Sequence, residues 1–516
     1  MLGTRVSAFL KLSKRDLKYD FPASIVVFLV ALPLCLGIAM ASGAPLFAGV
    51  LTGVIGGLVV GAISGSPLSV SGPAAGLTVI VFGAIEKLGS YEIFLLAVVL
   101  AGLIQFLLGL VKAGMIGNYF PSSVILGMLA AIGITIILKQ LPLAFGNTGE
   151  TEATQPFLTA FLAQIHWGAT IICLLSLLTL IFWPRFRYLN KVPAPLAAVL
   201  LGVGLALLFQ YTSLALMPAH YVSIPTLSSL TELTSLLIFP DFTYILEKEV
   251  WVIAFTLAII ASLETLLSLE AVDKLDPFKR NSPTNRELIA QGIGNMTSGF
   301  LGGLPMTSVI VRSSANVNAG GRTRQSAMLH GVWLLVALLA IPQLINMIPL
   351  ACLAAILLHT GYKLAKPALF RQMFRRGLDQ FIPFAATILA IVMTDLLMGV
   401  GIGLLVATFY ILKANMQNAY NFEIKDENTA VLTLAEEVSF LNKVPIKKRL
   451  YNLPKTVNHV VINGEKSKFI DKDVIEVLKD FEQNALSKGL NIQLQEVTSK
   501  RKVVRTSRNR RLQKVI

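Results

Sequence analysis

Long apolar segments, uncharged or nearly so, follow one another along most of this 516-residue chain. About 14 can be counted, and each approaches the roughly 20 residues that a helix needs to cross a bilayer. The pattern predicts a polytopic α-helical membrane protein. The segments lie near residues 23–41, 45–63, 73–88, 92–111, 121–138, 168–183, 193–210, 249–271, 288–303, 307–318, 326–345, 347–361, 381–396 and 398–414.

The pattern changes near residue 422. Beyond it, alternating or short apolar runs typical of strands are interleaved with two helical patterns. The strand patterns are residues 428–442, 458–464 and 490–497, and the helical patterns are residues 444–453 and 471–489. This order predicts a small α/β domain over residues 422–496, followed by a basic tail over residues 497–516.

Basic residues between the apolar segments predict the orientation. Cytoplasmic loops of membrane proteins carry an excess of lysine and arginine, and here basic residues gather in alternate loops. These are residues 184–191, 273–286, 320–325 and 363–376. We take the charged residues 1–19 as a cytoplasmic lead-in rather than a cleaved signal peptide. Both termini are therefore expected in the cytoplasm, with the chain in the cell membrane.

Two segments, residues 64–85 and 302–324, are interrupted by glycine and proline. In each, a short extended piece precedes a short helical run. Ser71 in the first segment, and Thr307 or Ser308 in the second, are candidates to cap that helix. Both segments are therefore predicted to form helices that begin inside the membrane.

The positions of the interrupted segments predict an internal repeat. Each is the third in a set of seven, so the chain divides into repeats at approximately residues 20–210 and 249–416. With seven segments each, the two repeats enter the membrane from opposite sides. Short, interrupted segments at matching places of inverted repeats indicate a transporter binding site.

Arg312 is the most unusual residue of the second interrupted segment, because it stands among Val309, Ile310 and Val311. A guanidinium buried in hydrocarbon costs several kcal/mol unless it faces water, an anion or a carboxylate. Helix N-termini carry partial positive charge and bind anions. Two such ends together with Arg312 predict an anion site.

Glu264 is the candidate partner, since it lies well inside the segment at 249–271 and has Ser268 one helical turn further on. An acid within the membrane is typical of a proton relay or a cation ligand. A purely structural ion pair between Glu264 and Arg312 is an alternative that the sequence leaves open.

Composition excludes other classes of protein. The chain is 54% hydrophobic and 14% charged, and its three cysteines and five histidines have no metal-ligand or disulfide spacing. No catalytic set is visible, so neither an enzyme nor a bound metal or cofactor is expected. The net charge of +15 comes partly from eight basic residues among the last 20. Beside a membrane, such a tail is expected to meet anionic lipid rather than nucleic acid.

Three motifs, "SGSPLSVSGPAAGLTVIV", "SLETLLSLEAVD" and "GGLPMTSVIVRSSANVNAGGRTR", resemble those of the sulfate permease (SulP) family of anion transporters. The resemblance covers residues 20–416, and the region after residue 422 is similar to a short STAS domain. It implies a homodimer of seven-plus-seven inverted topology that works by an elevator-like movement.

The resemblance also implies the site residues. The anion is expected between the two half-helices, with backbone N–H groups from both sides and an attracting charge on Arg312. Glu264 matches a carboxylate tied to Na⁺ or H⁺ coupling, with Ser268 beside it. The backbone is that of Pro73, Ala74, Ala75 and Gly76 on one side and of Ser308, Val309, Ile310 and Val311 on the other.

These observations favour a secondary transporter of a small inorganic anion of the sulfate or bicarbonate class, coupled to H⁺ or Na⁺. Two alternatives stay open. One is an uncoupled anion channel, and the other is a nucleobase permease of the same fold, against which Arg312 argues.

Overall fold

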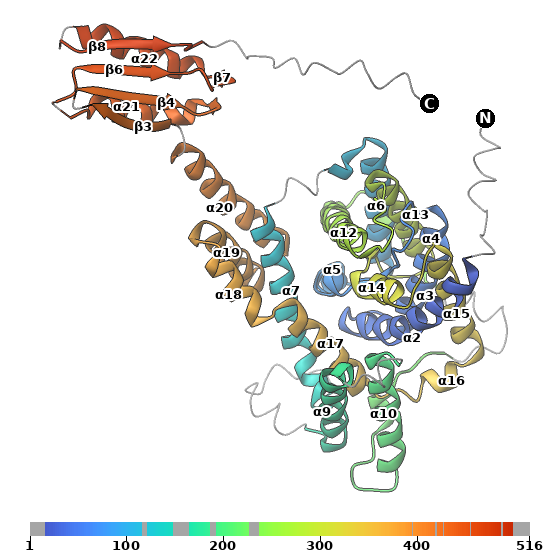
Figure 1. Cartoon of the computed structure of the whole chain (residues 1–516). Helices are drawn as coiled ribbons and strands as arrows, with labels where there is room; N and C mark the ends of the chain where they lie inside the picture. The colour runs from blue at the N-terminus through green and yellow to red at the C-terminus, as the bar shows by residue number, and fades with distance from the viewer. Residues whose placement is uncertain are drawn as a thin grey trace, which may run out of the picture. The chain divides into compact units, whose positions relative to one another are not determined.

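The computed structural model describes residues 16–115, 121–147, 165–185, 192–225, 237–394, 396–417, 420–426, 428–454, 456–486 and 489–498. The chain forms two compact units, Met1–Leu404 and Leu405–Ile516 (Figure 1). Most of the predicted lead-in (1–19) and nearly all of the basic tail (497–516) lie outside the described residues.

A helix lies in each of the predicted apolar segments. The helices are α2 (Leu17–Ala41), α3 (Leu46–Ile55), the π-helix η1 (Gly56–Val60), α4 (Gly61–Ile63), η2 (Ala75–Leu77), α5 (Thr78–Leu88), α6 (Tyr91–Leu110), α7 (Ser122–Ala144), α9 (Trp167–Phe182), η4 (Trp183–Arg185), α10 (Ala194–Phe209), η6 (Pro218–His220), η7 (Phe242–Tyr244), α12 (Lys248–Leu275), α13 (Thr284–Phe300), α14 (Ile310–Asn318), α15 (Gln325–Ala340), α16 (Pro342–Ile345), α17 (Leu350–Leu364), α18 (Pro367–Arg375), α19 (Leu378–Met393) and α20 (Leu396–Gln417).

Seven helical stretches in the described part of the chain are long and apolar enough to cross a membrane. Three shorter apolar helices, α10, α15 and α19, accompany them. Large apolar side chains remain exposed on the outer helices, for example Leu107 on α6 and Leu208 on α10. Such surfaces suit lipid rather than water. The count of 14 crossings stays a prediction.

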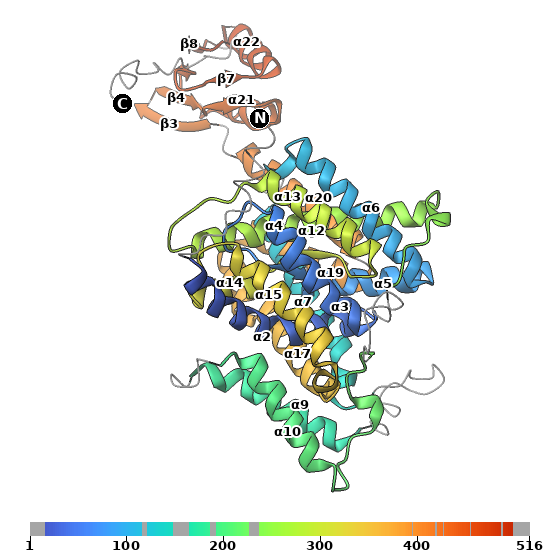
Figure 2. The same cartoon turned by 90° about the vertical axis from the view of Figure 1, so that its right-hand side faces the viewer.

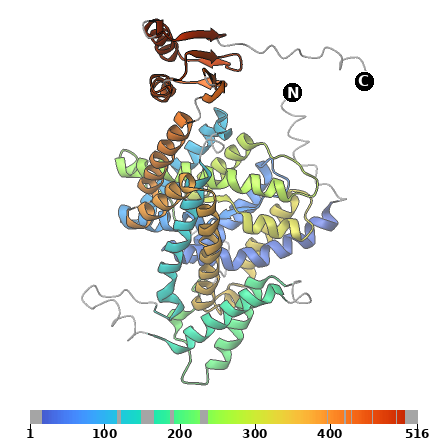
Figure 3. The ribbon, with the colours of Figure 1, turned by 60° about the vertical axis from the view of Figure 1, so that its left-hand side comes forward.

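The helices of the first unit pack as two groups. One group brings together α2, α3, α6, α12, α13, α14 and α15, with α5 at its side (Figure 2). The other is built on α7, which packs against α17 and α19, while α9 packs against α10 and α17 (Figure 3). Contacts between the groups run mainly through α2 and α5. Both half-helices therefore belong to the first group.

Close helix packing within the first group depends on small residues. On the facing surfaces of α6 and α13, a Cβ added to Gly102 would lie 2.5 Å from the Met296 backbone nitrogen, and one added to Gly292 would meet the Phe106 nitrogen at 2.5 Å. The absence of side chains lets these two backbones approach closely, as small residues do in membrane helix pairs.

A buried carboxylate ties the start of α2 to the turn before α15. Asp20 is fully buried, and it accepts hydrogen bonds from the N–H of Arg322 at 2.7 Å, from the N–H of Thr323 at 3.0 Å and from the Thr323 hydroxyl. Arg322 also stacks on the Tyr19 ring at 3.4 Å. The chain returning from the second half-helix is thus anchored to the first helix.

We expect Asp20→Ala to lower the free energy of unfolding by roughly 2–4 kcal/mol, because it leaves the partly buried N–H groups of Arg322 and Thr323 without acceptors. Thermal unfolding of the purified protein in detergent measures the loss. Asp16→Ala is the matched control, since Asp16 stands at the N-cap of α2 without a side-chain cap bond. Equal unfolding temperatures of the two variants would contradict this role of Asp20.

The second unit contains the predicted α/β domain. Its sheet has the order β3 (Tyr420–Asp426), β4 (Thr429–Leu434), β6 (His459–Asn463), β8 (Asn491–Gln495), with β3 antiparallel to β4 and the other pairs parallel. Helices α21 (Lys443–Tyr451) and α22 (Lys472–Leu486) pack on it around Val460, Ile462 and Leu478. A smaller pair joins β5 (Glu437–Val438) and β7 (Phe469–Ile470), and η8 (Phe440–Asn442) precedes α21.

The sequence pattern predicted β4, β6, β8, α21 and α22. The single strand predicted over residues 428–442 is divided in the structure into β4, β5 and the 3-10 helix η8, and β3 and β7 were not predicted. β3 begins at Tyr420, two residues before the predicted start of the domain. Gly489, predicted to close α22, has φ +69°, the left-handed conformation of a helix-ending glycine.

Candidate anion-binding site

Two short strands lie side by side within the first helix group, and we call the place where they meet the strand crossing, or the crossing. β1 (Ser71–Pro73) and β2 (Met306–Ser308) pair antiparallel, with Ser71 opposite Ser308 and Pro73 opposite Met306. Each strand leads into a short helix, β1 into η2 and α5, and β2 into α14. The two half-helices that the sequence predicted are therefore joined at their N-terminal ends by a common backbone ladder.

The hydroxyls predicted to cap these helices have other roles. The N-cap positions are Leu77 for α5 and Val309 for α14, and neither has a side-chain cap. Ser71, Thr307 and Ser308 lie within the strands instead, and the Ser308 hydroxyl bonds the Ser69 hydroxyl at 2.6 Å. The capping prediction is wrong, because these residues belong to the paired strands and each helix has its N-cap further along the chain, at Leu77 and Val309.

The absence of caps leaves helix-end donors free. In α14, Ile310 and Val311 have backbone N–H groups with no acceptor among the described residues. The side chains of Ile310 and Val311 are 43% and 42% exposed, so this end of the helix is not covered by the rest of the protein. Ser308 donates its N–H to the Thr265 hydroxyl at 3.3 Å, and Val309 donates to the Val70 carbonyl at 3.0 Å. Of the four predicted donors on this side, two are therefore already occupied.

On the opposite side, Ala74 and Ala75 have N–H groups without an acceptor in the described chain. Gly76 directs its N–H at the carboxylate of Glu264. Pro73 offers no donor, because proline has no N–H. The two ends together present unpaired donors from Ala74, Ala75, Ile310 and Val311, an arrangement that suits an anion.

Arg312 lies behind this crossing and is completely buried. Its Nη2 donates to the carbonyl oxygen of Pro73 at 3.3 Å, while Nε and Nη1 have no hydrogen-bond partner. Gly72 makes room for the guanidinium, since a Cβ there would lie 2.0 Å from Nη1. The thiol of Cys35 also lies beside the guanidinium. The arginine thus contributes its charge from beneath β1, in the other half of the chain.

The described residues contain no ion pair between Arg312 and a carboxylate. The pairs within 4.0 Å join Lys274 to Glu270, Arg280 to Asp276, Lys443 to Asp473 and Lys468 to Glu436. The structural Glu264–Arg312 pair that the sequence left open is therefore not formed. A buried guanidinium with unpaired donors needs a compensating negative group, and an anion at the crossing would supply it.

Glu264 lies on α12 next to the first half-helix. Its Oε2 is buried without a partner, and a Cβ on Gly76 would lie 2.7 Å from Oε1. Thr265, the next residue, holds the backbone of Ser308 through its hydroxyl. Ser268 is buried one turn further along α12. The predicted coupling carboxylate is consequently in contact with one side of the crossing, while its neighbour holds the other.

A cavity of about 410 Å³ separates the two helix groups beside the first half-helix. Val79 and Ile80 of α5 lie at one wall, and Thr135 and Lys139 of α7 lie at another. Lys87 also lines it, and Lys139 lies over the Phe82 ring at 3.4 Å from its centre. The cavity runs along α5 from Val79 to Lys87, and two lysines belong to its lining.

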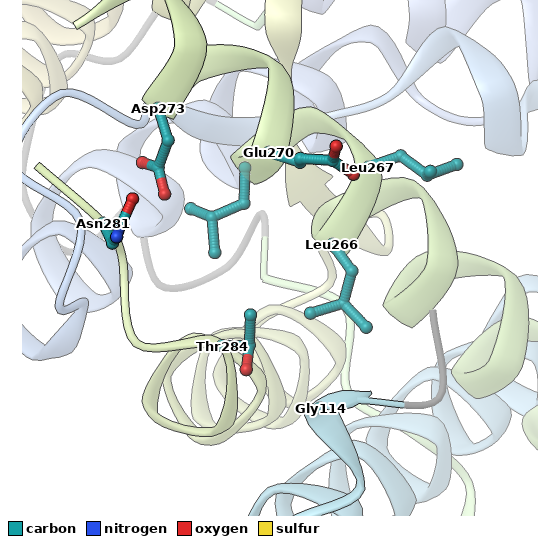
Figure 4. A pocket seen from close by; sticks show the side chains of 8 residues that line it. Gly114, Leu266, Leu267, Glu270, Asp273, Asn281 and Thr284 are labelled. Carbon is teal, nitrogen blue, oxygen red and sulfur yellow. The ribbon is translucent and has the colours of Figure 1, made fainter. Parts of the chain in front are cut away.

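A second cavity, of about 180 Å³, lies toward the other end of α12 (Figure 4). Its acidic lining residues already have partners. Glu270 pairs with Lys274 at 2.6 Å, and Asp273 accepts hydrogen bonds from the N–H and hydroxyl of Ser282 at 2.7 and 2.6 Å. No cluster of three metal-ligating side chains occurs among the described residues.

A buried polar stripe on α13 was not predicted from the sequence. Glu287 is fully buried and accepts hydrogen bonds from Ser64 and, at 3.1 Å, from Gln291. Gln291 also donates to the Ser71 hydroxyl at 2.7 Å, and Asn295 bonds both the N–H and the carbonyl of Met306. The stripe thus holds both crossing strands. The sequence does contain a signal for this stripe, because polar residues spaced by four share one helix face.

Residues 17–387 match the sulfate permease family. The chain belongs to the sulfate permease family. Membership makes it a multi-pass membrane protein, and the named relatives of this family member are transporters rather than enzymes.

Two curated relatives illustrate the family. The putative sulfate transporter YvdB of Bacillus subtilis is 32% identical over 400 residues, which cover 76% of this chain and 73% of the relative. The bicarbonate transporter BicA of a Picosynechococcus species is 26% identical over 462 residues, covering 86% of this chain and 79% of the relative.

Solved structures share the fold. The transmembrane domain of a cyanobacterial bicarbonate transporter BicA superposes with a TM-score of 0.66 at 25% identity, covering 76% of this chain and 99% of that chain. The structure of SLC26A9 superposes with a TM-score of 0.76 at 15% identity and covers 95% and 86% of the two chains. The latter likeness concerns the fold alone.

Proposed function

We propose that this member of the sulfate permease family is a secondary active transporter of a small inorganic anion of the sulfate or bicarbonate class. The observation that carries the proposal is the strand crossing, where unpaired N–H groups of two half-helices meet above a buried, uncompensated Arg312. Such a site favours negative charge without selecting its shape. The names of the relatives, sulfate and bicarbonate transporters, support the substrate class.

Coupling to H⁺ or Na⁺ is proposed to act through Glu264, with Ser268 beside it. The carboxylate contacts Gly76 at the end of the first half-helix, so its negative charge opposes an anion at the same end. Two like charges about 6 Å apart repel by about 3 kcal/mol at an effective dielectric constant of about 20. A proton or a sodium ion on Glu264 removes this repulsion, so cation and anion binding favour each other.

The two helix groups supply the moving parts of the proposal. The group with the strand crossing moves as one body against the group built on α7, in an elevator-like movement that exposes the anion to each side in turn. The cavity between the groups, with Lys87 and Lys139, is the approach from the side where α5 ends.

The location and assembly of the protein are also part of the proposal. The protein lies in the cell membrane as a homodimer, with both termini in the cytoplasm. The α/β domain is taken as a STAS-like domain, and the basic tail as a contact for anionic lipid.

Uptake into proteoliposomes tests the function. We expect labelled sulfate or bicarbonate to accumulate above its external concentration when an inward H⁺ or Na⁺ gradient is imposed, and to stop accumulating when an ionophore removes that gradient. Flux that never exceeds equilibration would favour the uncoupled channel. Uptake of a neutral nucleobase without any anion uptake would overturn the substrate class.

A further inference from the structure

The segment η8–α21 of the second unit has two different faces. One face is buried in the domain through Asn442, Ile446 and Leu450, which follow one another at intervals of four. The opposite face is exposed and is formed by Phe440, Val444, Lys447, Lys448 and Tyr451, which we call the α21 face. Residues with this spacing share one side of a helix.

The chemistry of the α21 face is unusual for a surface exposed to water. Phe440, Val444 and Tyr451 are 61%, 65% and 45% exposed, and the two lysines stand between them. Apolar and aromatic side chains interspersed with lysine are typical of helices that lie at a membrane interface. Lysine methylenes follow apolar surface while the ammonium groups reach for phosphate.

A hydrogen bond joins the segment before α21 to the end of α20. Asn442 is buried, and its Nδ2 donates to the carbonyl of Asn415 at 2.8 Å, while its Oδ1 accepts from the N–H of Ser439 at 2.8 Å. Asn415 is next to the end of the candidate span Met398–Met416. The turn before α21 is therefore bound to the C-terminal end of the candidate membrane-spanning helix.

Neighbouring charges leave the α21 face positive. Asp473 pairs with Lys443 at 3.6 Å, and Glu436 pairs with Lys468 at 2.5 Å. Arg449 is turned away from the face and lies over the Phe422 ring at 3.8 Å. Lys447 and Lys448 are both exposed, so they determine the charge that an approaching surface meets.

We propose that the α21 face docks on the headgroup layer of the bilayer and binds anionic lipid. Phe440 and Val444 enter the interface, and Lys447 and Lys448 contact lipid phosphates. Because α20 tethers the domain to the membrane, the α21 face is held at a high effective concentration near the lipid, and individually weak interactions suffice for docking. Each lysine close to an anionic surface contributes roughly a fivefold factor to the equilibrium.

The test uses the full chain with a reporter in the α21 face. The three native cysteines are all buried, at 0%, 5% and 0% exposure for Cys35, Cys173 and Cys352, so an introduced surface thiol reacts selectively. Val444→Cys is labelled with bimane and reconstituted in phosphatidylcholine vesicles with or without about one third phosphatidylglycerol. A spin label on lipid headgroups serves as the quencher. Gln493→Cys is the matched control, on the exposed edge strand β8 at the opposite edge of the sheet from β3.

We expect the label at position 444 to be quenched at least twofold more strongly in the anionic vesicles than in the neutral ones, and the label at 493 to be quenched in neither. Combining Val444→Cys with Lys447→Glu and Lys448→Glu should remove the difference between the lipids. Both lysines are exposed, and an unchanged unfolding temperature confirms that this variant folds.

Two results would overturn the proposal. One is equal quenching at positions 444 and 493, which means that no lipid contact exists. The other is a label at 444 that is shielded from soluble quenchers but not quenched by lipid. That outcome would assign the α21 face to a protein partner, such as a second copy of the chain.

Discussion

Arg312→Gln is expected to raise the apparent Kd for the transported anion by about ten- to a hundredfold. The change removes a full positive charge beneath the crossing, and a hydrogen bond to a charged group is worth about 1.5–3 kcal/mol. Equilibrium binding of labelled anion, together with the concentration dependence of uptake, measures the effect.

The variant is also expected to keep or raise its unfolding temperature, because the wild-type guanidinium is buried with two nitrogens unpaired. This separates a binding defect from misfolding. Arg371→Gln, the same change at an exposed position of α18, is the matched control. Wild-type affinity in Arg312→Gln would overturn the assignment of the anion site.

Glu264→Gln is expected to abolish accumulation while leaving anion flux down its own gradient. The amide keeps the size of the side chain but carries no charge that a proton or sodium ion can neutralise. Uptake with an imposed H⁺ or Na⁺ gradient should then fall at least tenfold, toward simple equilibration, since about 3 kcal/mol of coupling energy is removed.

Glu270→Gln provides the comparison for that experiment. Glu270 lies on the same helix but is exposed and paired with Lys274, so its variant should accumulate anion like the wild type. The coupling role of Glu264 is contradicted if accumulation in Glu264→Gln still follows the cation gradient. Loss of all flux in this variant would instead indicate that Glu264 holds the crossing together.

The helices and the two interruptions that lead into half-helices could be predicted because their signals are local. Apolar length marks a membrane helix, and glycine with proline marks the interruptions that became β1 and β2. Arg312 and Glu264 were visible as isolated charges in apolar surroundings. The pairing of Ser71 with Ser308 brings together the two interrupted segments that the sequence placed at matching positions of two predicted repeats.

Details of the site could not be predicted, because they depend on contacts between distant residues. Ser308 has a hydroxyl suited to capping, yet its backbone is held by Thr265 and its side chain by Ser69. Val309 gives its N–H to Val70. The sequence contains all these groups, but only the folded chain decides which of them remain free for an anion.

Glu287 and β3 were missed by the sequence analysis for two different reasons. Glu287, Gln291 and Asn295 are spaced by four, but residues 288–303 were read only as an apolar membrane segment. The strand β3 also had a readable pattern, since Tyr420, Phe422 and Ile424 alternate with polar residues, but it begins before the predicted start of the domain and directly follows a membrane helix. Its pairing with β4 is a contact that the local pattern does not specify.

Gly72 makes two distant segments of the chain depend on each other. The space that it leaves beside β1 is filled by Arg312 of α14, and a Cβ at position 72 would lie only 2.0 Å from Nη1. A side chain at position 72 would therefore force the guanidinium of Arg312 to move, so the residue at position 72 determines where this buried charge can lie. Positions 72 and 312, far apart in the sequence, are therefore expected to change together rather than independently.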